Sequence, residues 1–357
     1  MAMRTDVKVG IAMVAAAVII AVAGILLWTP RTSRGSGGLT VTPKMGRPGW
    51  FETRFEAMGT YGRFEVKAHD GKAARRMFEA ALPQVRTVEG LMSLYRPDSE
   101  VSRLNRMGAQ QAVKLSDHTL AVLRKSVEVS RLTGGAFDVA YAPLRTLWRQ
   151  AERDGRPPSD SAIKAALQAV GYTKLVLEGD RVRFAVPGME VDLGGVAAGY
   201  GVDLAVQALQ QAGATAGIVD IGGDLRFFGT PGPGEKWRVM VNPPPGVREN
   251  IVLAVPPCGV ATSGDYERHY TIGRKEYSQI IDPRTGRPVE KMASVTVVAP
   301  DGITADTLST GLSVMGPQES VALVDTLADI HCLIIVREAD GTMRKVMSRS
   351  FAAFVED

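Results

Sequence analysis

Cysteine and histidine are scarce in this chain. Its two cysteines, Cys258 and Cys332, permit one disulfide but neither a disulfide framework nor a cysteine-rich metal cluster. No two histidines have a metal-ligand spacing such as His-x-x-x-His. The four histidines are His69, His118, His269 and His331. A zinc hydrolase is therefore a poor interpretation of the sequence.

Two catalytic motifs and a basic cluster are also missing. The chain has no Gly-x-Ser-x-Gly elbow and no P-loop, which argues against a triad hydrolase. Without the first 38 residues, the 42 Lys or Arg and 38 Asp or Glu fall to 38 and 37, so the net charge drops from +4 to +1. A nucleic-acid-binding surface needs basic residues gathered on one face. We expect no nucleic-acid partner.

One long apolar stretch lies near the N-terminus. Val9 to Trp28 is 20 residues long, and a helix of that length spans roughly 30 Å, the thickness of a bilayer core. The alternative is a cleaved signal peptide, because Ala21-Val22-Ala23 has the small-x-small form of a processing site. Residues 1–28 are therefore predicted to be a membrane anchor or a signal segment.

The rest of the chain divides into a tether and a folded body. Residues 29–50 lack hydrophobic periodicity and include Gly35-Ser36-Gly37-Gly38, which predicts a flexible tether. A single catalytic domain is expected over 51–357. Its expected helices are 77–92, 117–132, 196–212, 304–315 and 318–327. Its expected strands are 53–68, 217–221, 237–241, 251–255, 295–299 and 332–336, with a hairpin at 175–186. This mixing favours an α+β fold.

The stretch from Gly302 to Gly316 contains the most informative pair of residues. Asp306 and Thr310 are four residues apart in a helix-compatible run of small and apolar residues. Two oxygen ligands then share one helical face. A carboxylate and a hydroxyl so placed suit a hard divalent cation with open positions for phosphate oxygens. Phosphate chemistry is the first hypothesis.

Three glycine-containing turns strengthen that hypothesis when they are taken together. Gly194-Gly195 precedes an amphipathic helix, where backbone N–H groups are able to meet a phosphate. Similar turns at 220–224 and 262–268 follow hydrophobic strands. Each alone is equally consistent with an ordinary turn that binds no ligand. Ligand sites, however, form where several loops converge at strand ends.

Two further loops have a functional and a structural interpretation. Residues 278–288 read as a β-turn, and a hairpin with exposed arginines is the simpler interpretation. Tyr95 lies on an expected loop, where its ring is available to stack on a planar ligand or to serve as a surface anchor.

Eight ordered segments resemble the FAD:protein FMN transferase family, the ApbE-type flavin transferases. The resemblance covers roughly residues 55–336 and is strong because all the segments occur in order. The segments are 57–60, 92–105, 134–138, 192–200, 221–224, 262–266, 281–286 and 305–310.

This resemblance implies a specific fold and reaction. The fold would be ApbE-like, with a two-lobed mixed β core flanked by helices. The apolar stretch from Val9 to Trp28 would add one N-terminal transmembrane helix. The enzyme would depend on Mg²⁺, take FAD as substrate, attach FMN through a phosphoester to a Thr or Ser of a client protein, and release AMP. The client would be a membrane-associated redox protein. The apolar stretch, the tether and the ordered segments together predict a periplasmic catalytic domain tethered to a bacterial inner membrane.

The resemblance also assigns roles to individual residues. The metal ligands would be Asp306, Thr310 and the backbone carbonyl of Ala197, with Asp282 as a further catalytic residue beside Asp306 and Thr310. The residues that would bind FAD are Met58, Tyr95, Asp138, Asp192, Gly195, Thr262, Ser263, Gly264 and Asp265.

The sequence departs from the family pattern at three places. Gln279 replaces a histidine common in relatives, and its amide cannot act as a general base. Ala198 replaces a common lysine, and the run 137–143 differs from the usual one. Two other functions therefore stay open: an FAD pyrophosphatase that uses water as acceptor, and a non-catalytic FAD-binding protein.

Overall fold

The computed structural model describes residues 39–356, apart from 248, 266–268 and 291. These residues belong to one compact unit that begins at Leu39. Within them, no helix has both the length and the hydrophobicity needed to cross a membrane. The apolar stretch predicted to be an anchor, 1–28, lies outside the described residues.

A nine-stranded antiparallel sheet forms the centre of the unit. Most of its strands alternate their side chains between two buried faces, and β16 is buried along its whole length. In sheet order the strands are β1 (Thr42–Pro43), β2 (Trp50–Ala57), β3 (Thr60–Lys67), β7 (Gly217–Ile221), β8 (Asp224–Phe228), β11 (Gly259–Gly264), β16 (Met292–Ala299), β17 (His331–Arg337) and β18 (Met343–Met347).

Four small sheets and the helices surround this centre. The small sheets are β9 (Trp237–Val241), β10 (Ile251–Val255) and β19 (Val355–Glu356); β4 (Val113–Lys114), β5 (Leu175–Glu178) and β6 (Arg181–Phe184); β12 (His269–Ile272) with β13 (Lys275–Ser278); and β14 (Ile281–Asp282) with β15 (Arg287–Pro288). The α-helices are α2 (Gly71–Met92), α3 (Glu100–Met107), α4 (Asp117–Leu132), α5 (Ala142–Asp154), α6 (Asp160–Leu167), α7 (Ala197–Gln211), α8 (Gly302–Met315) and α9 (Pro317–Val324). The 3₁₀ turns are η1 (Val139–Tyr141), η2 (Tyr172–Lys174) and η3 (Phe351–Phe354).

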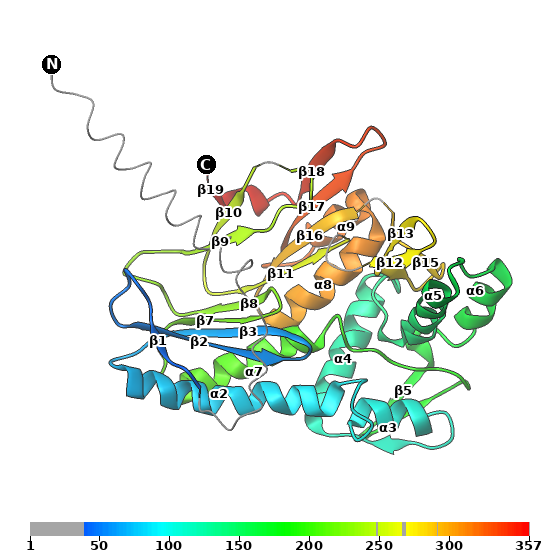
Figure 1. The fold of residues 1–357 in the computed structure, drawn as a ribbon, viewed down its shortest axis with the longest axis horizontal. Helices are drawn as coiled ribbons and strands as arrows, with labels where there is room; N and C mark the ends of the chain where they lie inside the picture. The colour runs from blue at the N-terminus through cyan, green and yellow to red at the C-terminus, as the bar shows by residue number, and fades with distance from the viewer. Residues whose placement is uncertain (1–38, 248, 266–268, 291, 357) are drawn as a thin grey trace. The chain divides into compact units, whose positions relative to one another are not determined.

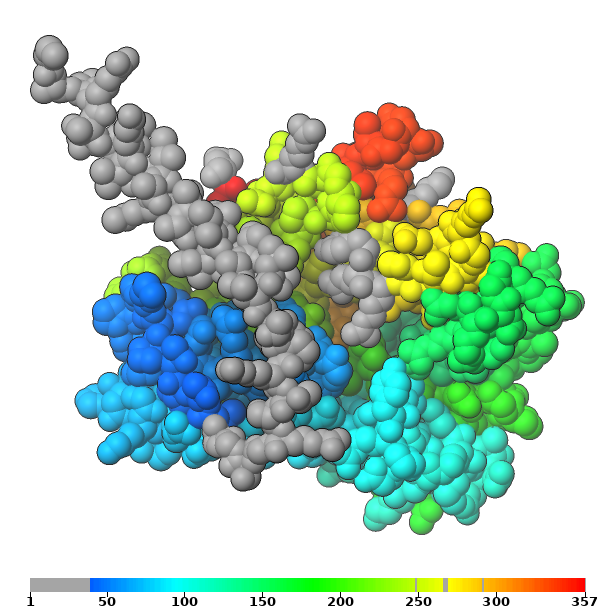
Figure 2. Space-filling view, in the orientation of Figure 1, coloured from blue at the N-terminus to red at the C-terminus, as the bar shows by residue number. Residues whose placement is uncertain are grey.

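The two faces of the central sheet are covered differently (Figure 1). Helices α2, α7 and α8 lie on one face, where Phe64 and Phe78 are fully buried. The sheet β9–β10–β19 packs on the other face, around Trp237 and Leu253. A separate hydrophobic cluster centred on Trp148 joins α5 and α6 to the hairpin β12–β13. The surfaces of these elements, green and yellow, adjoin in Figure 2.

This architecture confirms the predicted α+β class, and several predicted elements match closely. The helix expected at 117–132 is α4, and the hairpin expected at 175–186 is β5–β6. One prediction was wrong. The strand expected at 53–68 is a hairpin, because Met58 and Gly59 adopt positive φ angles of 54° and 73° and reverse the chain.

The boundary predicted for the tether also needs correction. Residues 39–50 belong to the folded unit, which begins before the expected start at 51. Strand β1 pairs with β2, and the N–H of Lys44 donates to the carbonyl of Trp50. The Trp50 ring is 4% exposed and packs edge-on against Trp237. An apolar ring next to a Gly/Pro-rich stretch gave too weak a pattern to be recognised as part of the core.

Candidate active site

A cavity of about 1090 Å³ brings together most of the residues singled out from the sequence. Its walls come from the β2–β3 turn and from α5, α7, α8 and β11. The predicted residues that line it are Met58, Tyr95, Asp138, Asp192, Gly195, Ala197, Thr262, Ser263, Gly264, Asp306 and Thr310. Segments more than 200 residues apart in the sequence therefore share one site.

Asp306 and Thr310 occupy neighbouring turns of α8, as the sequence predicts. The Asp306 side chain is buried, and one of its carboxylate oxygens accepts a hydrogen bond of 2.9 Å from the Gly199 N–H. Burial raises the pKa of this carboxyl to about 7, and the charge of Asp203 adds to the shift. The Thr310 hydroxyl lies 3.5 Å from the Ser263 hydroxyl. The two predicted ligand oxygens thus face one part of the cavity.

The close crossing of α7 and α8 sets the position of Asp306. A methyl group on Gly199 would lie 2.5 Å from the Gly302 carbonyl and 2.6 Å from the Asp306 Cβ, so only glycine fits there. Asp203 of α7 accepts hydrogen bonds from the first N–H groups of α8, at Gly302 (2.8 Å) and Ile303 (2.9 Å). These contacts fix the register of the two helices.

The donor set at this crossing fits a hard cation. Asp306 offers a carboxylate with one protein hydrogen bond, Thr310 offers a hydroxyl, and Ala197 lines the same cavity at the start of α7. Gly195 lies so close to Thr310 that an added Cβ would be 3.0 Å from its hydroxyl oxygen. Among residues 39–356, as far as described, no three His, Cys, Asp or Glu side chains cluster. The donor set at Asp306 differs from such a cluster, because it combines one carboxylate with a hydroxyl and a backbone carbonyl.

Two more acidic residues of the cavity are held by the backbone. Asp192 accepts from the Gly194 N–H at 2.8 Å and pairs with the Arg145 guanidinium at 2.8 Å. Asp138 accepts from two N–H groups, those of Ala140 and Tyr172. Burial nevertheless raises the Asp138 pKa to about 6, because desolvation outweighs these hydrogen bonds.

The Tyr95 ring is an exposed aromatic that two arginines hold in place. The ring is 79% exposed at the cavity, and its hydroxyl accepts from Arg149 at 3.2 Å and Arg145 at 3.4 Å. The hydrogen bond from Arg149 lowers the Tyr95 pKa. Neither arginine is among the site residues predicted from the sequence. Their spacing of four residues, on one face of α5, was the available signal.

Met58 forms part of the cavity wall from a strained turn. Its N–H donates to the Glu89 carboxylate at 2.8 Å, which holds the positive φ angle. The end of its side chain lies against Gly201 of α7, where an added Cβ would be 3.0 Å from the Met58 methyl carbon. The β2–β3 turn is thereby fastened to both α2 and α7.

Two predicted residues do not reach the cavity. The Asp282 carboxylate is bound by the N–H and the guanidinium of Arg284 and is absent from the cavity lining. Its neighbours Ile281 and Pro283 line the cavity instead. Asp265 pairs with Arg337 at 2.7 Å and is likewise absent from the lining. In this structure, both carboxylates hold loops in place.

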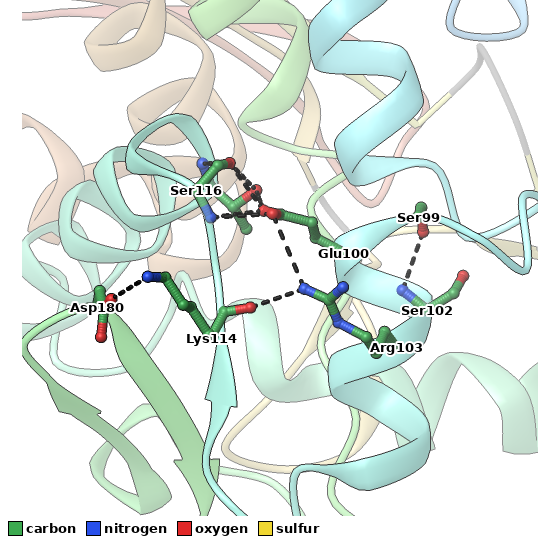
Figure 3. A network of polar contacts seen from close by, with 8 residues as sticks. Ser99, Glu100, Ser102, Arg103, Lys114, Ser116 and Asp180 are labelled. Atoms are coloured by element: carbon green, nitrogen blue, oxygen red, sulfur yellow. Dashed lines mark hydrogen bonds and ion pairs between the residues drawn. The ribbon is translucent and has the colours of Figure 1, made fainter.

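A second depression, of about 540 Å³, contains none of the predicted site residues. Figure 3 shows why its polar groups are not available to a ligand: they bind one another. The Glu100 carboxylate accepts from the Ser116 N–H and hydroxyl. Arg103 donates to the Lys114 carbonyl, and the Lys114 ammonium pairs with Asp180. This network fastens α3 to α4 and to the sheet β4–β5–β6.

The sequence and the fold match known proteins along most of the chain. The family model described as ApbE family matches residues 58–334. The proteins named FAD:protein FMN transferase from Vibrio cholerae and Escherichia coli K12 are 34% and 31% identical, over 84% of this chain and 90% and 88% of theirs. The solved flavin transferase ApbE from Vibrio cholerae superposes with a TM-score of 0.74 at 31% identity, covering 85% of this chain and 99% of that one. The chain therefore belongs to the ApbE family.

Proposed function

We propose that this protein is an FAD:protein FMN transferase that depends on Mg²⁺. It transfers FMN from FAD to the hydroxyl of a Thr or Ser in a client protein and releases AMP. The observation that carries this proposal is the single cavity in which Asp306 and Thr310 of α8 meet Tyr95 and Asp192, within a fold that relatives of this name share.

Each group in the cavity has a defined task in this proposal. Asp306, Thr310 and the Ala197 carbonyl hold Mg²⁺, which supplies positive charge to the diphosphate when bound. The Gly199 N–H keeps the Asp306 carboxylate in position. The Ser263 hydroxyl, hydrogen-bonded to Ser309 at 2.8 Å, lies 3.5 Å from the Thr310 hydroxyl and adds a polar group beside it. Fixed charges of this kind act mainly by positioning and electrostatic stabilisation.

The flavin and the client occupy the wider part of the cavity. The exposed Tyr95 ring provides a flat apolar surface for the isoalloxazine ring. Arg145 and Arg149 hold that ring through its hydroxyl, so it is preorganised for stacking. Docking of the client segment then excludes water, which would otherwise compete with the client hydroxyl as acceptor.

Covalent flavin fluorescence tests this function. The full chain is incubated with FAD, Mg²⁺ and membranes from source cells that lack the gene, and the proteins are separated under denaturing conditions. We expect fluorescent client bands that require the protein, FAD and Mg²⁺ together. If no band appears with folded protein, although FAD and Mg²⁺ are present, FMN transfer is rejected.

The location of the protein is a second part of the proposal. The apolar stretch from Val9 to Trp28 anchors the chain in a bacterial inner membrane, and the catalytic unit faces the periplasm. Protease added to intact spheroplasts should digest the catalytic unit and leave cytoplasmic markers intact. Protection of the catalytic unit until the membrane is permeabilised would reject this orientation.

A further inference from the structure

Transfer to a client requires a group that removes the proton of the attacking hydroxyl. This inference rests on the proposed function and asks which side chain accepts that proton. A general base must lie in the cavity, be free to approach the hydroxyl, and be able to change its protonation near neutral pH. The described residues of the cavity lining offer carboxylates and one histidine.

The carboxylates are already occupied. Five of the six accept at least one hydrogen bond from the protein. The sixth, Asp224, has an interaction partner as well. Asp306 is assigned to the cation as well. The carboxylates with hydrogen-bond donors are Glu89, Asp138, Glu152, Asp192 and Asp306. These hydrogen bonds hold each carboxylate in one orientation, so it cannot turn toward a docked hydroxyl.

His269 differs from these carboxylates in three respects. Among the described residues, it is the one histidine that lines the cavity. Its side chain is 42% exposed, so a docked segment is able to reach the ring. Its Nε2 lies 3.5 Å from the Glu276 carboxylate on the neighbouring strand, which leaves the other ring nitrogen for a substrate.

The hairpin that carries His269 is fixed against the cavity wall. His269 begins β12 and stands opposite Ser278 of β13, the residue that precedes Gln279. Gln279 also lines the cavity. On the other side of the hairpin, Tyr270 is buried next to Trp148 of α5. The Thr271 N–H donates to Glu152 of α5 at 2.8 Å.

We propose that His269 is the general base of the transfer and that Glu276 positions its ring. The imidazole takes the proton of the client Thr or Ser hydroxyl. The hydroxyl oxygen forms a bond to the FMN phosphorus while the bond from that phosphorus to the bridging oxygen breaks. The bridging oxygen leaves on AMP with the electron pair.

Among the residues that the structure describes, two elements carry charged side chains near His269. Glu276 and Lys275 lie on the partner strand β13, and Glu152, Arg145 and Arg149 lie on α5. Glu276 favours the imidazolium that forms when the proton is accepted, whereas the cations of α5 oppose it. Replacing Glu276 should therefore slow the transfer without removing the base.

Four variants of the full chain test the assignment: His269→Gln, His269→Ala, Glu276→Gln and the control His118→Gln. His118 pairs with Tyr200 and is absent from the cavity lining. Single-turnover transfer from FAD to the client bands is measured with Mg²⁺ and the membranes described above. We expect about a 100-fold decrease or more for His269→Gln, a smaller one for Glu276→Gln, and none for His118→Gln, with FAD affinity unchanged throughout.

Two readouts separate a base from a structural residue. With Mg²⁺ saturating at every pH, so that Asp306 stays ionised, the single-turnover rate of the wild type should fall on the acid side of neutrality, where imidazoles become protonated, and His269→Gln should lose the part of this decrease that comes from the imidazole. Added imidazole should restore part of the activity of His269→Ala. If the wild type transfers FMN and His269→Gln keeps its rate and pH profile, His269 is not the base. If the wild type itself transfers nothing, the proposed function fails instead.

Discussion

At the scale of single residues, Asp306 is a buried carboxyl group whose charge has little compensation from the protein. The residue is 5% exposed, and its carboxylate accepts a hydrogen bond from the Gly199 N–H, the one such bond among the described residues. Burial raises its pKa to about 7, so without a cation the carboxyl is partly protonated at neutral pH. A carboxylate that is neither fully solvated nor paired with an arginine gains most from a bound dication.

Replacing Asp306 with Asn should therefore lower the activity while leaving the stability nearly unchanged. The amide keeps the acceptor for Gly199 but loses the charge, so we expect Mg²⁺-dependent transfer to fall by about 100-fold or more. The free energy of unfolding without Mg²⁺ should change by less than about 1 kcal/mol. Turnover and chemical denaturation measure the two quantities.

The matched control for this variant is Asp301→Ala on the same helix. Asp301 caps α8 through the Thr304 N–H at 2.9 Å and is absent from the cavity lining. Loss of the cap should cost about 1 kcal/mol of stability and leave most of the activity. Full activity in Asp306→Asn would contradict the ligand assignment.

Asp138 gives a prediction on pH. Its pKa rises from 3.8 to about 6 on folding, which corresponds to about 3 kcal/mol at most. Between these values the folded protein holds a proton that the unfolded chain has released, so stability falls as pH rises through this window. Relative to Asp138→Asn, the free energy of unfolding of the wild type should decrease from about pH 4 to 6 and level off above. Urea denaturation of both proteins measures this difference in free energy. A difference that stays constant or increases between about pH 4 and 6 would contradict the raised pKa of Asp138.

Most of the residues predicted from local sequence line one cavity, whereas two of them, Asp282 and Asp265, do not. The Asp282 and Asp265 carboxylates bind Arg284 and Arg337 instead. The Arg337 partner is 72 residues away in the chain, so no local pattern indicates it. Arg145 and Arg149 have a local signal, their four-residue spacing on one face of α5, but their contact with Tyr95 depends on the packing of α5 at the cavity.

At the scale of elements, the crossing of α7 and α8 determines the geometry of the predicted metal site. Gly199 and Gly302 let the two backbones touch, and Asp203 of α7 caps α8. Burial raises the Asp203 pKa to about 6, and the Arg226 guanidinium, 3.1 Å away, opposes that shift. The two helices thus present Ala197 and Asp306 in one fixed arrangement.

Gly199→Ala should disturb that arrangement. The new methyl group would meet the Gly302 carbonyl at 2.5 Å, so the helices must separate. We expect a loss of stability of about 1 to 3 kcal/mol and a loss of Mg²⁺-dependent activity in the protein that remains folded. Thermal denaturation and turnover are measured together. The control is Gly90→Ala on α2, where an added Cβ meets nothing within 4 Å; unchanged stability in Gly199→Ala would refute the close crossing.

Element prediction succeeded where one periodicity extended over many residues. The amphipathic helix α4 and the Val-rich hairpin β5–β6 follow directly from their patterns. The turn at Met58 was missed, because a methionine at positive φ is rare and the alternation of β2 continues into β3 across it. The order of strands in the central sheet is a tertiary property that no local pattern specifies.

At the scale of the whole molecule, ligand binding should couple to stability. FAD and Mg²⁺ contact α5, α7, α8 and the β2–β3 turn in the proposed complex. They therefore bind the folded state of the chain and not the unfolded state. At a ligand concentration of 100 times Kd the stabilisation is about 2.7 kcal/mol. The melting temperature should rise further with FAD and Mg²⁺ together than with either alone. Asp306→Asn should lose the increment that depends on Mg²⁺; an equal increment in this variant would contradict the site.

The central claim is that the acceptor of FMN is a client hydroxyl and not water. The most direct measurement is the amount of AMP released against the amount of flavin bound covalently to client, with free FMN assayed in the same sample. The account predicts equal amounts of AMP and covalent flavin, and slow AMP release when client is omitted. Rapid release of AMP and free FMN in equal amounts without any client would contradict it.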